Sequence, residues 1–391
     1  MTDTRVVREW LRSGVEAVAP ETVTRLGLAS HRGPLRVIAI GKAAPAMCRG
    51  AHEAVGEVSG ICVTDHEDPV PPGVDLLLGD HPVPGDLSLA AGRCALELAP
   101  DADLALISGG GSALCEVPID GVDIDFVAHV TERLLDFGAD IEEINLVRGH
   151  LSRVKAGGLG PLPTYLISDV GPWGQAVVSS GPTLPHQPDP ERAIAVIRKV
   201  GVGVPADIER AIRARTFATQ IPESVVTLAD GHTAAAAVAQ AAAGSGLHSR
   251  VSDRWLTGSV EGCVDEFIED APAGVTVAAG EPGVSVRGDG RGGRNTHAAL
   301  LAAERIAGTG WVFAALATDG VDGRSGSAGA VVDGTTVHRG GDPSLALETS
   351  DSASYLDRTG DLIPSGATGT NVADVWLLWK PEGRPEPILT S

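Results

Sequence analysis

Short apolar runs rich in Val, Ile and Leu alternate along the chain with longer stretches in which Ala and Leu recur at helical spacing. This alternation is typical of a parallel β-sheet whose strands are joined by helices. It predicts strands at 35–40, 61–65, 75–79, 104–108, 164–169 and 225–230. It predicts helices at 43–56, 86–98, 122–137, 190–200, 205–215 and 231–243. The first part of the chain is therefore expected to be a parallel α/β domain.

The pattern changes after about residue 270. Residues 275–290 read as two strands joined by a turn at Glu281-Pro282-Gly283. A helix at about 295–306 and strands at 311–320 and 375–379 follow. We therefore expect a second, smaller α/β domain, and assign residues 1–255 to the first domain and 256–391 to the second.

Composition agrees with two globular domains. The chain has 391 residues, of which 43% are hydrophobic and 21% are charged. The net charge of −21 comes from 51 acidic and 30 basic residues spread along the chain, which disfavours nucleic acid or an anionic membrane as a partner. An anionic substrate must therefore be attracted by a local positive site.

The cysteine count and the N-terminus indicate a cytoplasmic protein. Five cysteines without a C-x-x-C spacing suit reduced thiols. The first twenty residues read as an amphipathic helix with charges throughout, not as a signal peptide or anchor, and no apolar run reaches membrane length.

Six segments at predicted strand ends combine glycine with charged or hydroxyl residues. They are GKAAPAM (41–47), ISGGGSAL (107–114), SRVKAGGL (152–159), residues 167–185, RGDGRGGRN (287–295) and ATDGVDGRSGSAGA (317–330). Loops at the carboxyl ends of parallel strands are where ligands bind in open α/β sheets. Glycine lets backbone N–H groups approach an anion closely. These segments are therefore the candidate site.

The residues Ser108, Gly109, Gly110, Gly111 and Ser112 form the most concentrated of these loops. It matches neither the Walker pattern nor the dinucleotide fingerprint. One interpretation is a cradle for phosphate, with Ser112 capping the next helix. The other is a strained strand-to-helix turn without a ligand. The five companion segments favour the cradle.

Charged residues in the other segments suggest contacts with an anion or a metal. The chain has only four lysines, and Lys42 and Lys155 both lie beside glycines. Each could reach phosphate or carboxylate, or could be a surface lysine whose stem lies along the protein. Asp169 at a strand end is a further candidate carboxylate.

Two segments of the second domain carry the remaining candidates. Arg291 and Arg294 bracket two glycines, and their guanidinium groups suit a carboxylate or a phosphoryl group, with Asn295 as a helix cap. Asp319 and Asp322 could bind Mg²⁺ or accept a proton from a substrate hydroxyl. The alternatives are solvated arginines and turn aspartates bonded to their own backbone.

Taken together, these motifs resemble the type-2 glycerate kinases, whose C-terminal part is called the MOFRL domain. HPVPG, LISGGGSALCEVP, SRVKAGGL, LISDV, SSGPTLP, GRGGRNTHAAL and TDGVDG follow in the family's order. The resemblance implies a Rossmann-like αβα sandwich and a smaller α/β MOFRL domain, with the active site in the cleft between them. It also implies transfer of phosphate from ATP, with Mg²⁺, to the 2-hydroxyl of glycerate.

The resemblance assigns roles to individual residues. Lys42 matches the family's proposed catalytic lysine, and Arg294 and Asp319 complete the expected catalytic set. The glycine loop and Lys155 match family motifs and are expected to bind the substrates. Apart from the resemblance, Asp169, Arg291, Asn295 and Arg324 are further expected binding residues. Asp319 and Asp322 are the expected Mg²⁺ ligands, and a homodimer is possible by the same analogy.

The sequence departs from the family pattern at three places. SDVGPWGQ stands where SDVxGDDP is common, Thr296-His297 follow GGRN, and Arg324-Ser325-Gly326-Ser327 stand in place of PTDA. Each change removes an acidic group or adds a possible cation. The hypotheses are a kinase of D-glycerate, a kinase of another hydroxy acid that possibly bears a phosphonate, or a catalytically silent nucleotide- or acid-binding homologue. A nicotinamide-dependent hydroxypyruvate reductase is the weakest alternative, because the dinucleotide fingerprint is missing.

Overall fold

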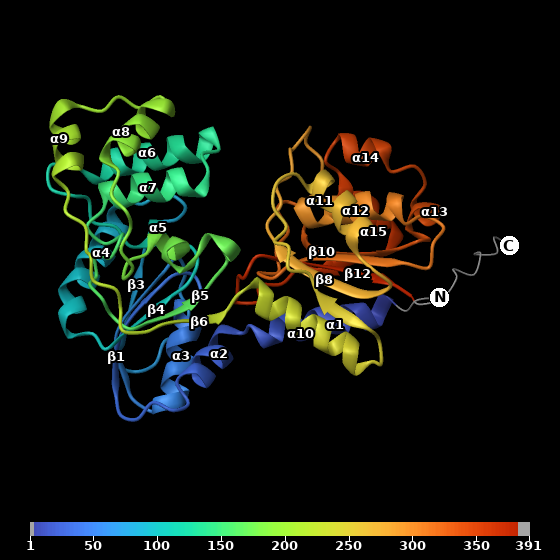
Figure 1. Ribbon diagram of the computed structural model, residues 1–391, viewed down its shortest axis with the longest axis horizontal. Coiled ribbons are helices and arrows are strands. Elements are labelled where there is room, and N and C mark those ends of the chain that lie inside the picture. The colour runs from blue at the N-terminus through green and yellow to red at the C-terminus, as the bar shows by residue number, and fades with distance from the viewer. Residues whose placement is uncertain (1–3, 382–391) are drawn as a thin grey trace. The chain divides into compact units, whose positions relative to one another are not determined.

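The computed structural model describes residues 4–381 and divides the chain into two compact units. One unit contains residues 20–228, and the other contains the described residues before and after it, 4–19 and 229–381. Each unit is built around one six-stranded sheet (Figure 1). For convenience the first is called the sheet A unit and the second the sheet C unit.

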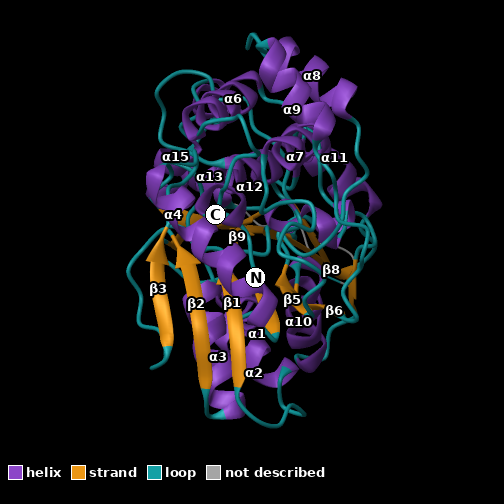
Figure 2. Ribbon diagram, turned by 90° about the vertical axis from the view of Figure 1, so that its left-hand side faces the viewer, coloured by secondary structure: helices purple, strands orange, loops and turns teal. Residues whose placement is uncertain are grey.

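The sheet A unit has strands in the order β3-β2-β1-β4-β5-β6. Their bounds are β1 (Leu35–Ile40), β2 (Val58–Thr64), β3 (Val74–Leu78), β4 (Leu104–Ile107), β5 (Thr164–Ile167) and β6 (Val225–Ala229). The pairs from β3 to β5 are parallel. Figure 2 shows β3, β2 and β1 side by side with their carboxyl ends at the same edge. All six predicted strands are confirmed, each within three residues at either end.

Helices cover both faces of sheet A. They are α2 (Pro20–Gly27), α3 (Ala44–Val55), α4 (Asp86–Leu98), α5 (Gly111–Leu114), α6 (Ile124–Phe137), α7 (Ile141–Leu151), α8 (Pro190–Lys199) and α9 (Ala206–Ala214), with 3₁₀ turns η1 (Ala99–Asp101), η2 (Gly171–Trp173) and η3 (Gln175–Ser180). Helices α6 to α9 form a layer with its own apolar core (Figure 1). Asp123, Asp140 and Asp189 cap α6, α7 and α8 by accepting backbone N–H groups.

The sheet C unit has strands in the order β11-β10-β9-β12-β8-β7. They are β7 (Ser249–Val251), β8 (Gly274–Gly280), β9 (Val312–Ala317), β10 (Ser327–Asp333), β11 (Leu362–Pro364) and β12 (Asp374–Lys380). Its helices are α1 (Thr4–Ala17), α10 (Gly231–Gly244), α11 (Val260–Asp270), α12 (Arg294–Arg305), α13 (Thr336–Gly340), α14 (Ser344–Glu348) and α15 (Ser352–Thr359). Helices α1 and α10 cover one face of the sheet, and α11, α12 and α15 cover the other (Figure 1). Phe313 and Trp376 fill the core on the second face.

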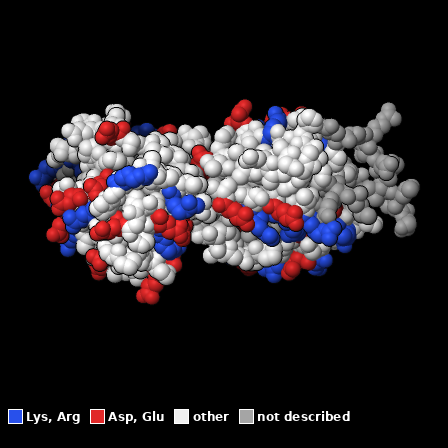
Figure 3. Space-filling model, turned by 90° about the horizontal axis from the view of Figure 1, so that it is seen from below, with Lys and Arg blue, Asp and Glu red and all other residues white. Residues whose placement is uncertain are grey.

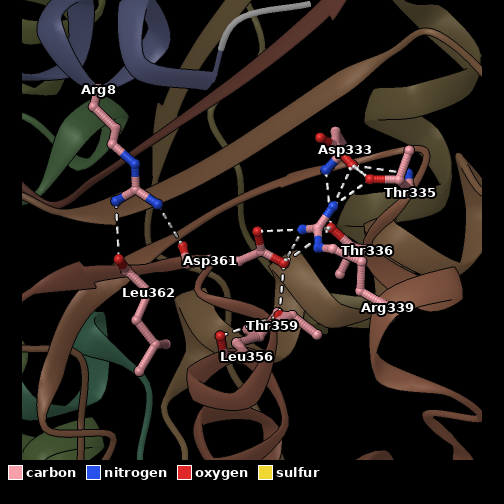
Figure 4. A network of polar contacts seen from close by, with 9 residues as sticks. All are labelled: Arg8, Asp333, Thr335, Thr336, Arg339, Leu356, Thr359, Asp361 and Leu362. Carbon is pink, nitrogen blue, oxygen red and sulfur yellow. Dashed lines mark hydrogen bonds and ion pairs between the residues drawn. The ribbon is translucent and has the colours of Figure 1, made fainter. Parts of the chain in front are cut away.

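The compact units differ from the predicted ranges in where α1 and residues 229–255 belong. Arg8 of α1 donates hydrogen bonds to the carbonyls of Asp361 and Leu362, 3.0 and 2.9 Å away. Figure 4 shows that the Asp361 carboxylate also binds Arg339, Thr336 and Thr359. Because such long-range contacts leave no trace in a local pattern, α1 reads from sequence as part of the neighbouring domain.

The second strand predicted within 275–290 is wrong. Only β8 forms there, and β12, from the far end of the sequence, occupies the antiparallel position beside it. The backbone after β8 bonds to scattered partners instead, as when the Arg287 N–H donates to the Ser350 hydroxyl at 2.8 Å. Residues 281–293 are therefore an irregular loop that lies at a pocket described below.

All five cysteines are free, in agreement with the prediction of reduced thiols. Among the described residues, no helix has the length and apolar character needed to cross a membrane. On the face shown in Figure 3, acidic and basic side chains are interspersed.

Candidate active site

The strand order of sheet A locates a candidate site in that unit. The order reverses between β1 and β4. Strands β2 and β3 lie in turn on one side of β1, whereas β5 and β6 lie in turn on the opposite side, beyond β4. Ligands of open α/β sheets bind outside the carboxyl ends of the strands at such a point. Lys42 follows β1 and the glycine loop Ser108–Ser112 follows β4. The structure therefore brings these two predicted elements together.

The conformation of the glycine loop explains its composition. Gly110 has a left-handed φ of 85°, and α5 begins directly after it. A Cβ at Gly109 would lie 2.3 Å from Oδ2 of Asp169, and one at Gly110 would lie 3.0 Å from Cγ of Lys42. The Lys42 N–H donates to the carbonyl of Gly109 at 3.0 Å. Lys42 and Asp169 thus lie directly against the loop, and glycine is what makes their approach possible.

Lys42 is accessible and has a carboxylate neighbour. Its Nζ lies 3.7 Å from Oδ2 of Asp65, and 49% of its side chain is exposed. Asp65 also bonds Nδ1 of His66 at 2.8 Å. Partial burial acts to raise the pKa of Asp65, but the His66 hydrogen bond and the charge of Lys42 bring it below its ordinary value. Sequence reasoning missed Asp65, although its place directly after β2 was an available signal.

Lys155 lies in a different environment. Its side chain is 1% exposed and forms an ion pair and hydrogen bond with Glu116, which is 2% exposed. Burial lowers the pKa of Lys155, and Glu116 opposes that shift. The ammonium is therefore occupied inside the protein, in contrast to the expected contact with phosphate or carboxylate.

Four of the predicted residues of the second domain line a pocket of about 520 Å³ in the sheet C unit, namely Arg294, Asp319, Asp322 and Arg324, whereas Asn295 does not. Its lining includes Glu281, Pro282, Gly283, Val284, Val286, Gly290, Gly292, Gly293, Arg294, His297, Asp319, Val321, Asp322, Gly323, Arg324, Ser350, Ser352 and Asn371. Arg291 is outside this lining and pairs with the exposed Asp357 at 2.9 Å.

Arg294 is already held by two acidic residues. Its Nε and Nη2 donate to the two oxygens of Asp374 at 2.5 and 3.1 Å, and its Nη1 donates to Glu281 at 2.7 Å. Asp374 is fully buried, which raises its pKa to about 7 although Arg294 opposes the shift. The arginine side chain is therefore fixed against β12, and both Asp374 and Glu281 were missed by sequence reasoning.

Asp322 caps a helix. One carboxylate oxygen accepts the backbone N–H of Asn295 at 2.9 Å, and the other accepts that of Thr296 at 2.8 Å. The Asn295 side chain also donates to Asp322 and accepts the indole N–H of Trp376 at 3.0 Å. Both residues are buried, so they stabilise the start of α12.

Asp319 and Arg324 also line the pocket. Oδ1 of Asp319 accepts the Val321 N–H at 3.0 Å, which orients the carboxylate at the end of β9. Within residues 4–381, no group of three or more His, Cys, Asp or Glu side chains is placed to hold a metal ion. Mg²⁺ in kinases uses one or two carboxylates together with water and phosphate oxygens. Asp319 fits that donor set, whereas both oxygens of Asp322 are engaged.

Comparison with known proteins agrees with the predicted resemblance. Residues 6–213 match the domain of unknown function DUF4147, and residues 274–374 match the MOFRL family. The chain is 32% identical to the D-glycerate 2-kinase of Thermotoga maritima, with 94% of this chain and 96% of the relative aligned. It is 33% identical to a protein of Agrobacterium vitis named putative hydroxypyruvate reductase, with 95% and 93% aligned.

A solved structure shares the fold. The crystal structure of the Thermotoga maritima glycerate kinase superposes with a TM-score of 0.87 at 30% identity, covering 96% of this chain and 99% of that chain. The likeness extends through both units. The chain therefore belongs to the type-2 glycerate kinase family, with a DUF4147 region followed by a MOFRL region.

Proposed function

We propose that the chain transfers a phosphoryl group from ATP to the 2-hydroxyl of D-glycerate, giving 2-phosphoglycerate. The observation that carries this proposal is the glycine loop Ser108–Ser112 at the point where the strand order reverses, with Lys42 against it. The family relationship and the relatives named glycerate 2-kinase support the same activity.

Phosphoryl transfer requires positioning and charge stabilisation more than covalent chemistry. Lys42 carries an exposed positive charge beside backbone amides, an arrangement that stabilises the negative charge of the transferring group. Asp319 is proposed to accept the proton of the substrate hydroxyl or to contribute to Mg²⁺ binding. When bound, Mg²⁺ would neutralise phosphate charge, with Asp319 as the ligand that the chain offers.

We assign recognition of the carboxylate end of the acid to the pocket of the sheet C unit. Arg324 lines this pocket and is a cation that the family pattern lacks at this position. His297, another departure, also lines it, and burial lowers its pKa so that the imidazole is neutral near pH 7. The positive charge of Arg324 supports the second candidate, a kinase of a related hydroxy acid with additional negative charge.

A coupled assay of ADP release tests the proposal. Glycerate, erythronate, tartronate and a phosphonate-bearing hydroxy acid are compared at equal concentration, and the product is identified by phosphorus NMR. We expect glycerate to stimulate ADP release and the phosphate to appear on the 2-hydroxyl. Asp319→Asn should lower turnover while the protein remains folded.

The same assay separates the alternatives. If ATP binds but no acid stimulates ADP release, the kinase proposal fails and a silent binding homologue remains. Oxidation of NADH or NADPH with hydroxypyruvate is measured in parallel. Reductase activity without ADP release would instead support the function named for the Agrobacterium vitis relative.

A further inference from the structure

The loop between β5 and α8 contains an unusual run of backbone conformations. Ser179, Ser180 and Gly181 all have left-handed φ angles, of 51°, 59° and 60°. Residues other than glycine adopt this region at a cost, and they persist there only when the surrounding structure fixes them. Both serines are buried. The feature therefore needs a reason in the contacts of the two serines.

Each serine bonds to one end of the glycine loop. The Ser179 hydroxyl donates to the carbonyl of Ser108 at 2.6 Å. The hydroxyls of Ser180 and Ser112 share a hydrogen bond of 2.7 Å. Between these bonds, a Cβ at Gly111 would lie 2.5 Å from Oγ of Ser179. The serine pair thus contacts the beginning, the middle and the end of the loop.

A second segment supports the serine pair from behind. The N–H of Ala156 donates to the carbonyl of Ser180 at 3.0 Å, and that of Gly157 donates to Gly181 at 2.8 Å. Ala156 is itself left-handed, with a φ of 54°. Its neighbour Lys155 pairs with Glu116, which lies two residues after the end of α5. The buried ion pair and the serine contacts therefore fix both the glycine loop and the short helix that follows it.

A loop with three consecutive glycines has many accessible conformations when it is unsupported. If the loop is fixed before the substrate binds, the reaction does not bear the entropic cost of ordering the loop. The backbone amides of the loop are then already oriented toward the position of the phosphoryl group. We propose that Ser179 and Ser180 are positioning residues, whose hydroxyls hold the glycine loop in the conformation that receives the phosphoryl group. This inference rests on the proposed kinase function and adds two residues to its machinery.

A purely structural role for the serines makes a different prediction, and the same loop supplies the control. The hydroxyls of Thr164 and Thr183 share a buried hydrogen bond of 2.8 Å. Thr183 lies three residues after Ser180, but its hydroxyl bonds to β5 rather than to the glycine loop. Thr183→Val therefore removes a comparable hydrogen bond without touching the loop.

The first measurement compares Ser179→Ala, Ser180→Ala and Thr183→Val by kcat, KM and thermal midpoint. We expect each serine variant to lose about tenfold or more in kcat/KM, because small displacements of positioning groups have large kinetic effects. Thr183→Val should stay within about twofold while its midpoint falls by as much as those of the serine variants. Equal kinetic losses in all three variants would overturn the proposal.

Ser180→Gly separates positioning from folding in a second way. Glycine adopts a left-handed φ without the cost that serine has, so the thermal midpoint should fall less than in Ser180→Ala. Turnover should nevertheless drop, because the hydroxyl is gone and the backbone is freer. Retained turnover in this variant would show that the hydroxyl does not position the loop.

Hydrogen exchange of the glycine loop provides a readout that does not depend on activity. We expect amides of the peptide 104–116 to exchange faster in Ser179→Ala and Ser180→Ala than in the wild type, and at the wild-type rate in Thr183→Val. Unchanged exchange in the serine variants would overturn the positioning role. If the wild type releases no ADP with any acid, the kinase proposal fails, while the exchange result still decides whether the serines order the loop.

Discussion

The glycine loop Ser108–Ser112 and the segment Arg291–Asn295 both contain consecutive glycines, but the cations beside those glycines have different surroundings. Lys42, beside the first, is half exposed and lies 3.7 Å from a single carboxylate. Arg294, within the second, is bonded to both Asp374 and Glu281. In both cases a cation lies beside consecutive glycines. Burial and existing partners, rather than residue type, therefore decide which cation is available to a ligand.

Two lysines of the sheet A unit, Lys42 and Lys155, show the same difference within one unit. Lys42 and Lys155 both lie beside glycines, yet only Lys155 is buried and paired with Glu116. A buried ion pair is costly to break because its partner is left as an uncompensated charge. We therefore expect Lys42 to affect chiefly the reaction, and Lys155 and Arg294 to affect chiefly the fold.

The largest effect should come from breaking the Arg294 pair. Arg294→Met leaves the fully buried Asp374 without its guanidinium partner and should lower the free energy of unfolding by about 3–5 kcal/mol. Arg291→Met is the matched control, because Arg291 pairs with Asp357 at the surface and should contribute less than about 1 kcal/mol. Urea unfolding measures both variants. Similar small losses would show that Arg294 is not a structural residue and would return it to the catalytic candidates.

The next prediction concerns Lys42, the accessible cation of the comparison. Lys42→Ala should reduce kcat by about 10²–10³-fold, the range found when one stabilising group of a transition state is removed. The thermal midpoint should change little, since the side chain is half exposed. Lys199→Ala is the control, because Lys199 is equally exposed and pairs with Glu143 on the helical layer. A large fall in the thermal midpoint of Lys42→Ala would place this lysine with Lys155 among the structural residues.

Replacement of Asp319 and of Asp322, two aspartates of one motif, should change the stability of the protein by different amounts. Asp322→Ala removes the acceptor of two N–H groups at the start of α12 and should cost about 1–2 kcal/mol. Asp319→Ala removes a bond to a turn N–H only and should cost less than about 0.5 kcal/mol. Thermal or urea unfolding of the pair decides the point. An equal loss in both would contradict the assignment of Asp322 as the cap.

The strands of sheet A, together with β8, β9 and β12 of sheet C, follow from the sequence because their signals are local, whereas β7, β10 and β11 were not predicted. Runs of Val, Ile and Leu bounded by glycine give the six strands of sheet A, and the glycine-rich loops at their ends give the candidate site. The prediction fails at residues 284–290, where alternating apolar residues suggest a strand. The antiparallel partner of β8 comes instead from β12, a non-local pairing that no local window contains.

The roles of individual site residues depended even more on tertiary contacts. Nothing in SRVKAGGL indicates that Lys155 faces Glu116 in the interior. Likewise, the hydroxyls of Ser179 and Ser180 gain significance only when the fold brings them to a loop about seventy residues away in sequence. Residue type and position after a strand therefore identified a candidate site, but they could not distinguish residues that bind a ligand from residues that support the fold.

The smallest expected effect concerns pH in the sheet A unit. His150 is buried, and Nε2 accepts the Asp189 N–H at 3.1 Å while Nδ1 donates to the Leu146 carbonyl at 2.8 Å. Burial lowers the pKa of His150 from its ordinary value of 6.5. The unfolded chain therefore binds the proton more readily, so this contribution to stability is complete above pH 6.5 and is lost as the pH falls from there toward the folded-state value.

Urea unfolding of the wild type and of His150→Gln at pH 7.5 and 5.5 isolates this loss, which should be about 1 kcal/mol or less because protonation disrupts a single hydrogen bond. His150→Gln should reduce the difference between the two pH values, since an amide can make both bonds without titrating in this range. His129→Gln alters an exposed histidine on α6 and should leave the difference as it is in the wild type. If His150→Gln shows the full wild-type difference, the source lies in other histidines, namely His81, His186 and His297, because burial lowers the pKa of each in the same direction.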